Sequence, residues 1–175
     1  MKVSFTFNDT PVAWDIHPGE VLIETLRRLG WYGTKRGCNT GDCGTCTVRI
    51  DGTAVNACQV FTASLDGQSL QTIEGLAGRD VSTGQAVLHA VQENFVRSAA
   101  VQCGFCIPGM VMSSVALLNE NPSPTDADIR RALDGNLCRC TGYVKIFDAV
   151  RAAAEEMRGG NACNARASEG AGASR

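Results

Sequence analysis

The chain has 175 residues, a net charge of −2 at pH 7 and a pI of about 5.7, values that exclude the strongly basic character of most nucleic-acid-binding proteins. This length is enough for one ordinary domain or two small ones. The start resembles no signal peptide and no apolar stretch approaches the roughly 18 residues of a membrane span, so we expect a cytoplasmic chain without one.

The first part of the chain, residues 1–78, is predicted to be a small mixed sheet with one helix packed across it. Polar and apolar residues alternate in the first strand, and Asn8 and Asp9 supply a turn before the second. Apolar residues then recur at helical spacing from Glu20 to Gly30. The expected strands lie at residues 2–7, 12–16 and 45–50, in a short segment that ends near Cys58, and at residues 70–73.

The second part, residues 79–158, is predicted to be a bundle of four helices. Thr125 is a suitable N-cap for the third helix, because its hydroxyl can accept a hydrogen bond from a free amide of the first turn. Residues 159–175 have almost no large apolar side chains, so we expect a flexible tail with Cys163 as a free thiol. The expected helices lie at residues 85–97, 108–120, 126–133 and 143–157.

Eight of the nine cysteines fall into two sets of four with different spacings. The first set is Cys38, Cys43, Cys46 and Cys58. Its C-x4-C-x2-C…C spacing is that of plant-type ferredoxins, in which four thiolates hold a [2Fe–2S] cluster. Glycines are interleaved with the first three cysteines, and glycine lets the backbone wrap closely around a cluster and direct amides at its sulfurs.

The second set consists of two close pairs, Cys103 with Cys106 and Cys138 with Cys140. Each pair precedes an expected helix, and Thr141 is a candidate cap for the second of these helices. The positive end of a helix dipole lowers the pKa of a nearby thiol and favours an anionic cluster. We therefore expect a second [2Fe–2S] cluster, and we expect the chain to be poorly folded without its metal.

Three other interpretations compete with a pair of iron–sulfur clusters. Structural zinc sites favour paired C-x2-C units, which the first set does not have. A thioredoxin-like pair at Cys103 and Cys106 needs a βαβ context that is missing, and it leaves the later pair unexplained. His17 and His89 are conceivable Rieske-type ligands, but neither has a partner histidine next to a cysteine.

Three ordered motifs resemble the small iron–sulfur subunit of the xanthine oxidase, or molybdenum hydroxylase, family. They lie at residues 37–48, at 101–109 (VQCGFCIPG) and at 136–143 (NLCRCTGY). The resemblance extends over about residues 1–157 and implies an α+β fold. The implied domains are a β-grasp, ferredoxin-like domain followed by a four-helix-bundle domain, each with a [2Fe–2S] cluster.

The resemblance also implies a place in a larger enzyme, since no independent catalytic site is visible in this chain. Subunits of this family assemble with a large molybdopterin-binding subunit and often with a medium FAD subunit. They carry electrons from the molybdenum site through both clusters to flavin or another acceptor. By the same resemblance, Gln102 contacts the pterin and Cys140 is the cluster ligand beside it.

The alternative function is a free-standing two-cluster ferredoxin that carries electrons between soluble partners. A diffusing ferredoxin is usually strongly acidic, whereas this chain is nearly neutral. Helices such as the one at residues 108–118 are more apolar than one small bundle can easily bury, which favours an interface with a partner subunit.

Overall fold

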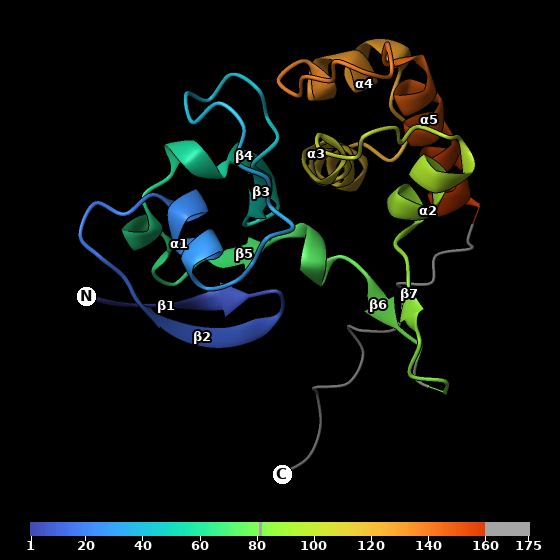
Figure 1. Ribbon diagram of the computed structural model, residues 1–175. Helices are drawn as coiled ribbons and strands as arrows, with labels where there is room; N and C mark the ends of the chain where they lie inside the picture. The colour runs from blue at the N-terminus through green and yellow to red at the C-terminus, as the bar shows by residue number, and fades with distance from the viewer. Residues whose placement is uncertain (81, 160–175) are drawn as a thin grey trace.

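The computed structural model describes residues 1–80 and 82–159. The N-terminal half forms a unit of sheet and helix, and the C-terminal half forms a helical unit beside it (Figure 1). Each unit has its own hydrophobic core, one with buried residues from Val3 to Leu70 and the other from Leu76 to Ala154. The predicted α+β fold is confirmed, and the domain boundary after residue 78 stays a prediction.

Five strands form the N-terminal sheet, in the order β2-β1-β5-β3-β4. The strands are β1 Lys2–Phe7, β2 Thr10–Asp15, β3 Thr47–Ile50, β4 Thr53–Asn56 and β5 Ser69–Gln71. β1 pairs antiparallel with β2 and parallel with β5. Asn8 and Asp9 have φ angles of 46° and 64°, as a two-residue hairpin turn of the right twist requires.

One helix, α1 (Leu22–Arg28), packs across this sheet. It buries Leu22 and Leu26, one turn apart, against the inward-facing side chains of β1, which alternate with exposed ones along the strand. This is the β-grasp arrangement. Three short 3₁₀ turns complete the unit: η1 Ala57–Gln59, η2 Thr62–Leu65 and η3 Ile73–Gly75.

The helical unit contains α2 Ala90–Arg97, α3 Ile107–Glu120, α4 Asp126–Leu133 and α5 Val144–Arg158. α2 packs against α5 and α3 against α4, and α3 also packs against β3 of the other unit. Thr125 caps α4 as predicted: its hydroxyl accepts from the amide of Asp128, whose carboxylate accepts from the amide of Thr125. The four-helix prediction is confirmed.

The helix predicted at residues 85–97 is wrong at its start. The residues before α2 form a small hairpin of β6 Gly78–Arg79 and β7 Ala86–Val87. His89 begins α2 instead, because its Nδ1 accepts from the amide of Val91 while the side chain of Gln92 accepts from the amide of His89. Leu88 fits the helical spacing in the sequence, yet its side chain lies 45% exposed outside the helix.

The expected flexible tail, with its free thiol at Cys163, lies outside the described residues except for Gly159. Within the described ranges, none of the helices has the length and apolar character needed to cross a membrane.

Candidate metal centres

The first cysteine set converges from two segments of the N-terminal unit. Cys38, Cys43 and Cys46 lie on the loop between α1 and β3, and Cys58 lies in η1, directly after β4. The loop passes so close to its own thiols that a β-carbon on Gly37 would lie 2.7 Å from the Cys43 sulfur. Only glycine leaves room for that path.

Cys38 and Cys43 form one pair, and backbone amides point at their sulfurs. Each of the two amides donates to the other residue's sulfur at 3.4 Å, and the Thr40 amide donates to Cys38 at the same distance. The hydroxyl of Thr40, together with these amides, lowers the pKa of the Cys38 thiol to about 6. The loop therefore favours the thiolate, which is the form that binds metal.

Cys46 and Cys58 form a second, buried pair. Burial raises the pKa of the Cys46 thiol to about 12, and the neighbouring side chain of Cys58 adds to this effect. The side-chain amide of Gln59 donates to the Cys58 sulfur at 3.4 Å. Two adjacent buried thiols ionise together only beside a strongly positive group, which bound iron supplies.

Cys106 and Cys138 form the inner pair of the second set. Cys106 is the N-cap of α3, and burial raises the pKa of its thiol to about 12, with the adjacent Cys138 contributing. Burial also acts to raise the pKa of Cys138, but the hydroxyl and amide of Thr141 outweigh it and the pKa lies below its ordinary value. These two groups donate to the Cys138 sulfur at 3.1 and 3.4 Å.

Cys103 and Cys140 form the outer pair, with their sulfurs 3.6 Å apart and both residues exposed. The neighbouring Cys103 raises the pKa of the Cys140 thiol. Gln102, the residue expected to contact a pterin, is also exposed and directly precedes Cys103. The structure thus brings Gln102 and Cys140 to the same end of the helical unit.

The eight thiols lie as four pairs, and this pattern fits two dinuclear clusters. In a [2Fe–2S] cluster each iron takes two thiolates, whereas a zinc site gathers its ligands around one ion. Within each set the pairs are still close enough for Cys43 to act on the pKa of Cys46, and Cys103 on that of Cys106.

Three other candidates from the sequence have structural roles. His17 is exposed, and its amide donates to the carboxylate of Glu20, while His89 caps α2. The prediction that Thr141 caps the last helix is wrong: α5 is preceded by Tyr143, whose φ is 69°. The Thr141 hydroxyl is instead engaged with Cys138 and with the amide of Tyr143.

Sequence reasoning missed Asn136, two residues before Cys138. Its side chain is buried between the two units and bonds Gly44, Thr47 and Ser113. An asparagine beside a glycine and a cysteine pair was the only available signal, and such residues are common in turns.

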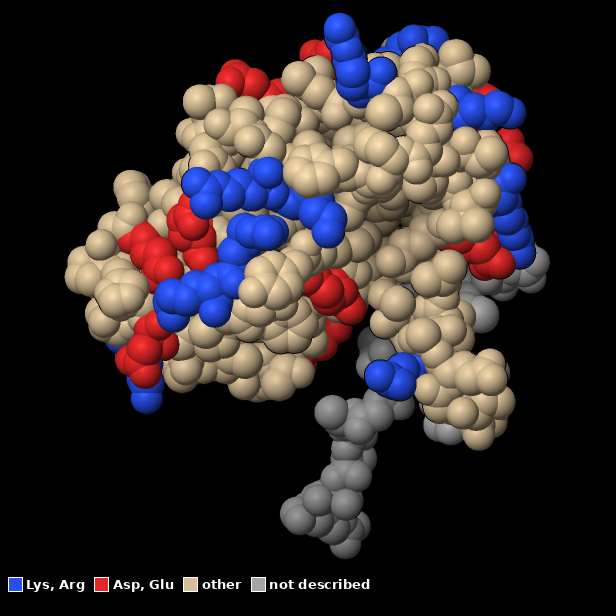
Figure 2. All heavy atoms as spheres, in the orientation of Figure 1, with Lys and Arg blue, Asp and Glu red and all other residues tan. Residues whose placement is uncertain are grey.

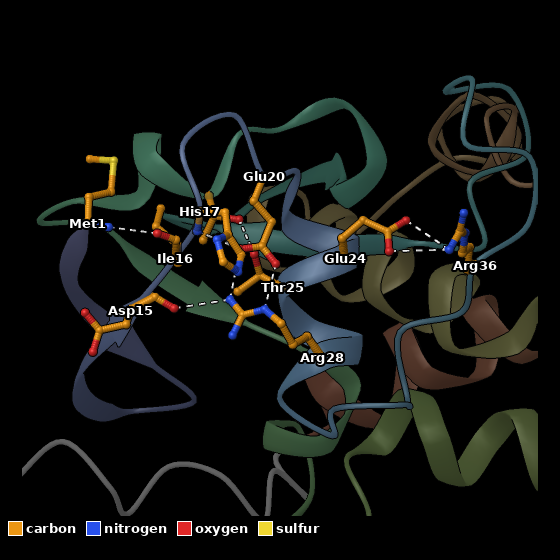
Figure 3. A network of polar contacts seen from close by, with 10 residues as sticks. Met1, Asp15, Ile16, His17, Glu20, Glu24, Thr25, Arg28 and Arg36 are labelled. Carbon is orange, nitrogen blue, oxygen red and sulfur yellow. Dashed lines mark hydrogen bonds and ion pairs between the residues drawn. The ribbon is translucent and has the colours of Figure 1, made fainter.

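Two ion pairs flank α1, one on the side of β2 and one on the side of the first cysteine loop (Figure 3). The carboxylate of Glu20 accepts two hydrogen bonds from Arg28, at 2.8 and 2.9 Å, and Arg28 also donates to the backbone oxygen of Asp15 on β2. Glu24 pairs with Arg36 at 3.0 Å, directly before the loop begins. On the face shown in Figure 2, charged side chains of both signs gather over this N-terminal unit.

Two family models match the chain. The 2Fe-2S iron-sulfur cluster binding domain matches residues 5–77, and the [2Fe-2S] binding domain matches residues 72–151. Together they cover both cysteine sets.

Among curated relatives, the chain is 44% identical to the nicotinate dehydrogenase small FeS subunit of Eubacterium barkeri, over 79% of this chain and 85% of that one. It is 43% identical to the xanthine dehydrogenase iron-sulfur-binding subunit of Escherichia coli O157:H7, over 86% and 92% of the two chains. Among solved structures, it matches a chain of quinoline 2-oxidoreductase from Pseudomonas putida 86 with a TM-score of 0.82 and 40% identity, over 91% and 97% of the chains.

Proposed function

The chain belongs to the family of small iron–sulfur subunits of the molybdenum hydroxylases, and on that premise we propose which of its residues hold and serve the two clusters. It is an electron-transfer subunit of a multi-subunit molybdenum-dependent oxidoreductase. The proposed ligands of the N-terminal [2Fe–2S] cluster are Cys38, Cys43, Cys46 and Cys58, and those of the C-terminal cluster are Cys103, Cys106, Cys138 and Cys140.

When bound, each cluster accepts and releases one electron. The residues around the thiols tune how readily it does so, because hydrogen bonds to ligand sulfurs stabilise the added negative charge and raise the reduction potential. The amide of Thr40 and the side chain of Gln59 serve the N-terminal set in this way. Thr141 serves the C-terminal set with two donors to a single sulfur.

The C-terminal set faces the molybdenum subunit in our proposal. The observation that carries it is the surface around the exposed pair Cys103 and Cys140. Large apolar side chains border this pair in the sequence and are themselves exposed: Val101 by 40%, Phe105 by 48%, Leu137 by 54% and Val144 by 65%. An apolar border of this kind around redox ligands suits a permanent protein interface rather than contact with water.

In this proposal Gln102, on the same surface, bonds the pterin, and Cys140 is the cluster ligand nearest to it. The side chain of Gln102 is exposed on the segment between α2 and α3, so an incoming cofactor can reach it. The N-terminal set is then the exit toward FAD on a medium subunit, or toward another acceptor. We also propose that the assembly is cytoplasmic.

The alternative function predicted from the sequence, a free-standing two-cluster ferredoxin, is not supported, because the relatives are subunits of larger oxidoreductases. It would carry the same cysteine pairs, but it would have to keep the apolar border of Cys103 and Cys140 in water. The apolar border favours the subunit role.

Val144→Asp tests the docking surface. Val144 is the first residue of α5, where a carboxylate favours the helix dipole, so the change should leave the fold intact. We expect at least about a tenfold loss of a large molybdopterin-binding chain in co-purification, since a buried charge at an interface is costly. Phe61→Asp is the matched control, because Phe61 is 59% exposed and caps η2 on the other unit. Full recovery of the large chain with Val144→Asp would show that the docking surface lies elsewhere, and failure to recover the large chain even with the wild type would favour the free ferredoxin.

A further inference from the structure

Two loops touch through their backbones: the first cysteine loop, which carries Cys38, Cys43 and Cys46, and the second cysteine loop, which lies between α4 and α5 and carries Cys138 and Cys140. The amide of Leu137 donates to the carbonyl oxygen of Cys43 at 2.9 Å. Cys43 is a ligand of the N-terminal set, and Leu137 directly precedes Cys138 of the C-terminal set. One hydrogen bond and a single intervening residue therefore connect a ligand of one set with a ligand of the other.

Glycines make this close approach possible. A β-carbon on Gly44 would lie under 3.0 Å from the carbonyl oxygen of Gly135, and one on Gly109 would lie equally close to the carbonyl oxygen of Gly44. Gly44 also has a φ of 66°, which side chains other than glycine rarely adopt. The backbone at Gly44 thus lies directly against the backbone at Gly135 on one side and against Gly109 of α3 on the other.

The side chain of Asn136 stabilises this contact from a buried position between the two units. Its side chain is only 3% exposed, and its amide nitrogen donates to the carbonyl oxygen of Gly44 at 2.8 Å and to the hydroxyl of Thr47 at 3.2 Å. Its side-chain oxygen accepts from the hydroxyl of Ser113, on α3, at 2.7 Å. One buried amide therefore joins the first cysteine loop, β3, α3 and the second cysteine loop.

We propose that Asn136 is a positioning residue that holds the two ligand sets at one fixed separation. Electron transfer between centres depends steeply on their distance, so two separately folded units need a rigid connection between their ligand loops. The Asn136 amide supplies three hydrogen bonds in a buried place, where removing one partner leaves the others unsatisfied. The proposal rests on the proposed function for the identity of the ligands, but the contacts do not depend on it.

Asn94 is a matched control within the helical unit. It is 5% exposed, and its side-chain nitrogen donates to the carbonyl oxygen of Ala90 and to the carboxylate of Glu156, at 2.9 and 2.8 Å. Replacing it removes a buried amide of similar exposure without touching either cysteine loop. A merely structural role for Asn136 would make the two replacements equivalent.

The experiment compares Asn136→Ala and Asn94→Ala in the full chain with both clusters loaded. We expect Asn136→Ala to speed amide hydrogen exchange about tenfold or more in the peptides that contain residues 43–47 and 135–139, because the bond between Leu137 and Cys43 opens more often. The spin–spin interaction between the two reduced clusters should weaken in the same variant. Asn94→Ala should leave both measurements at the wild-type value.

A milder variant keeps the test decisive if Asn136→Ala does not load its clusters. Ser113→Ala removes one of the three bonds and should speed exchange in the same two peptides to a smaller degree. Unchanged exchange in both variants, or an equal increase in Asn94→Ala, would overturn the proposal. If the proposed function were wrong, the result would be different: the chain would contain no labile sulfide, but hydrogen exchange in the two loops would still increase in Asn136→Ala.

Discussion

The phenol oxygen of Tyr143 accepts a hydrogen bond from the amide of Cys138 at 2.8 Å and donates to the carbonyl oxygen of Asn136 at 3.2 Å. A residue just before α5 thereby closes the second cysteine loop on itself. The backbone of Tyr143 has a φ of 69°, and its phenol oxygen reaches back to two backbone groups of the loop. The side chain of Tyr143 thus joins two backbone groups of the loop that carries Cys138 and Cys140.

Tyr143→Phe should weaken this loop selectively. The ring keeps its stacking contact with Phe147, but the amide of Cys138 and the carbonyl of Asn136 lose their partner. We expect a loss of about 1–2 kcal/mol in the free energy of unfolding. We also expect earlier loss of the C-terminal cluster during denaturation, followed by its electron paramagnetic resonance signal. A uniform loss of both signals would contradict this role.

Metal analysis should find about four irons and four acid-labile sulfides per chain. Cys43→Ser should remove or alter only the N-terminal cluster signal, and Cys106→Ser only the C-terminal one, because the two residues belong to different thiol sets.

Chelation of the iron should unfold the chain, since the buried thiols lose the charge that compensates them. Stoichiometric zinc without sulfide would show that the cluster assignment is wrong.

Gly44→Ala should destabilise the chain more than its backbone angle alone explains. Gly44 and Gly67 both have positive φ, 66° and 75°, but a β-carbon meets backbone atoms only at Gly44 and nothing within 4 Å at Gly67. Gly67→Ala should therefore cost about 1–2 kcal/mol, the price of the left-handed conformation. Gly44→Ala should cost at least about 1 kcal/mol more, as overpacking does. Denaturant unfolding of the two variants measures the difference, and equal losses would contradict the close approach of the loops.

The contribution of Glu20 should depend on pH in one direction. The hydrogen bonds from Arg28 hold the pKa of Glu20 at about 2, below its ordinary value of 4.5. The stabilisation is therefore complete above about pH 4.5 and declines as pH falls toward 2. Glu20→Gln should cost about 1 kcal/mol or less at pH 7, because Arg28 is partly exposed.

The pH dependence of the stabilisation by Glu20 can be measured by following the loss of cluster absorbance during unfolding of Glu20→Gln and the wild type in guanidinium chloride. The variant should bleach faster than the wild type at pH 7 and at pH 5 by the same factor. That factor should shrink when unfolding is started by a jump to pH 3. A difference that grows on acidification would show that the pKa of Glu20 is not depressed.

Gln102→Ala tests the proposed order of electron flow. Both clusters should assemble, because the side chain of Gln102 is not a ligand. In the assembled enzyme, reduction by substrate should slow, since an unsatisfied partner costs about 1–3 kcal/mol. Cys43→Ser should still allow substrate to reduce the C-terminal cluster while blocking transfer to the acceptor. Rapid-mixing spectroscopy distinguishes the two, and loss of C-terminal reduction in Cys43→Ser would invert the order.

Local sequence determined the approximate positions of the five strands of the N-terminal sheet, most helices and the identity of the thiols. Alternation of apolar residues marks β1, and the turn at Asn8 and Asp9 follows from two residues that tolerate positive φ. The capping box of α4 depends on Thr125 and Asp128 alone. These features need no distant contact, so a reading of neighbouring residues is sufficient. The predicted start of α2 was wrong because the apolar residues before it have helical spacing although the segment is extended. The cap at His89 determines where the helix begins.

Tertiary structure decided how the thiols pair and how the two units meet. Cys103 pairs with Cys140 rather than with Cys106, because the segments that precede α3 and α5 meet in the fold, and sequence spacing does not specify that meeting. The bond from Asn136 to Gly44 spans 92 residues and lies where α3 packs against β3. The sequence by itself therefore determined that this chain holds two iron–sulfur clusters. Their mutual placement depends on long-range packing, which no local pattern encodes.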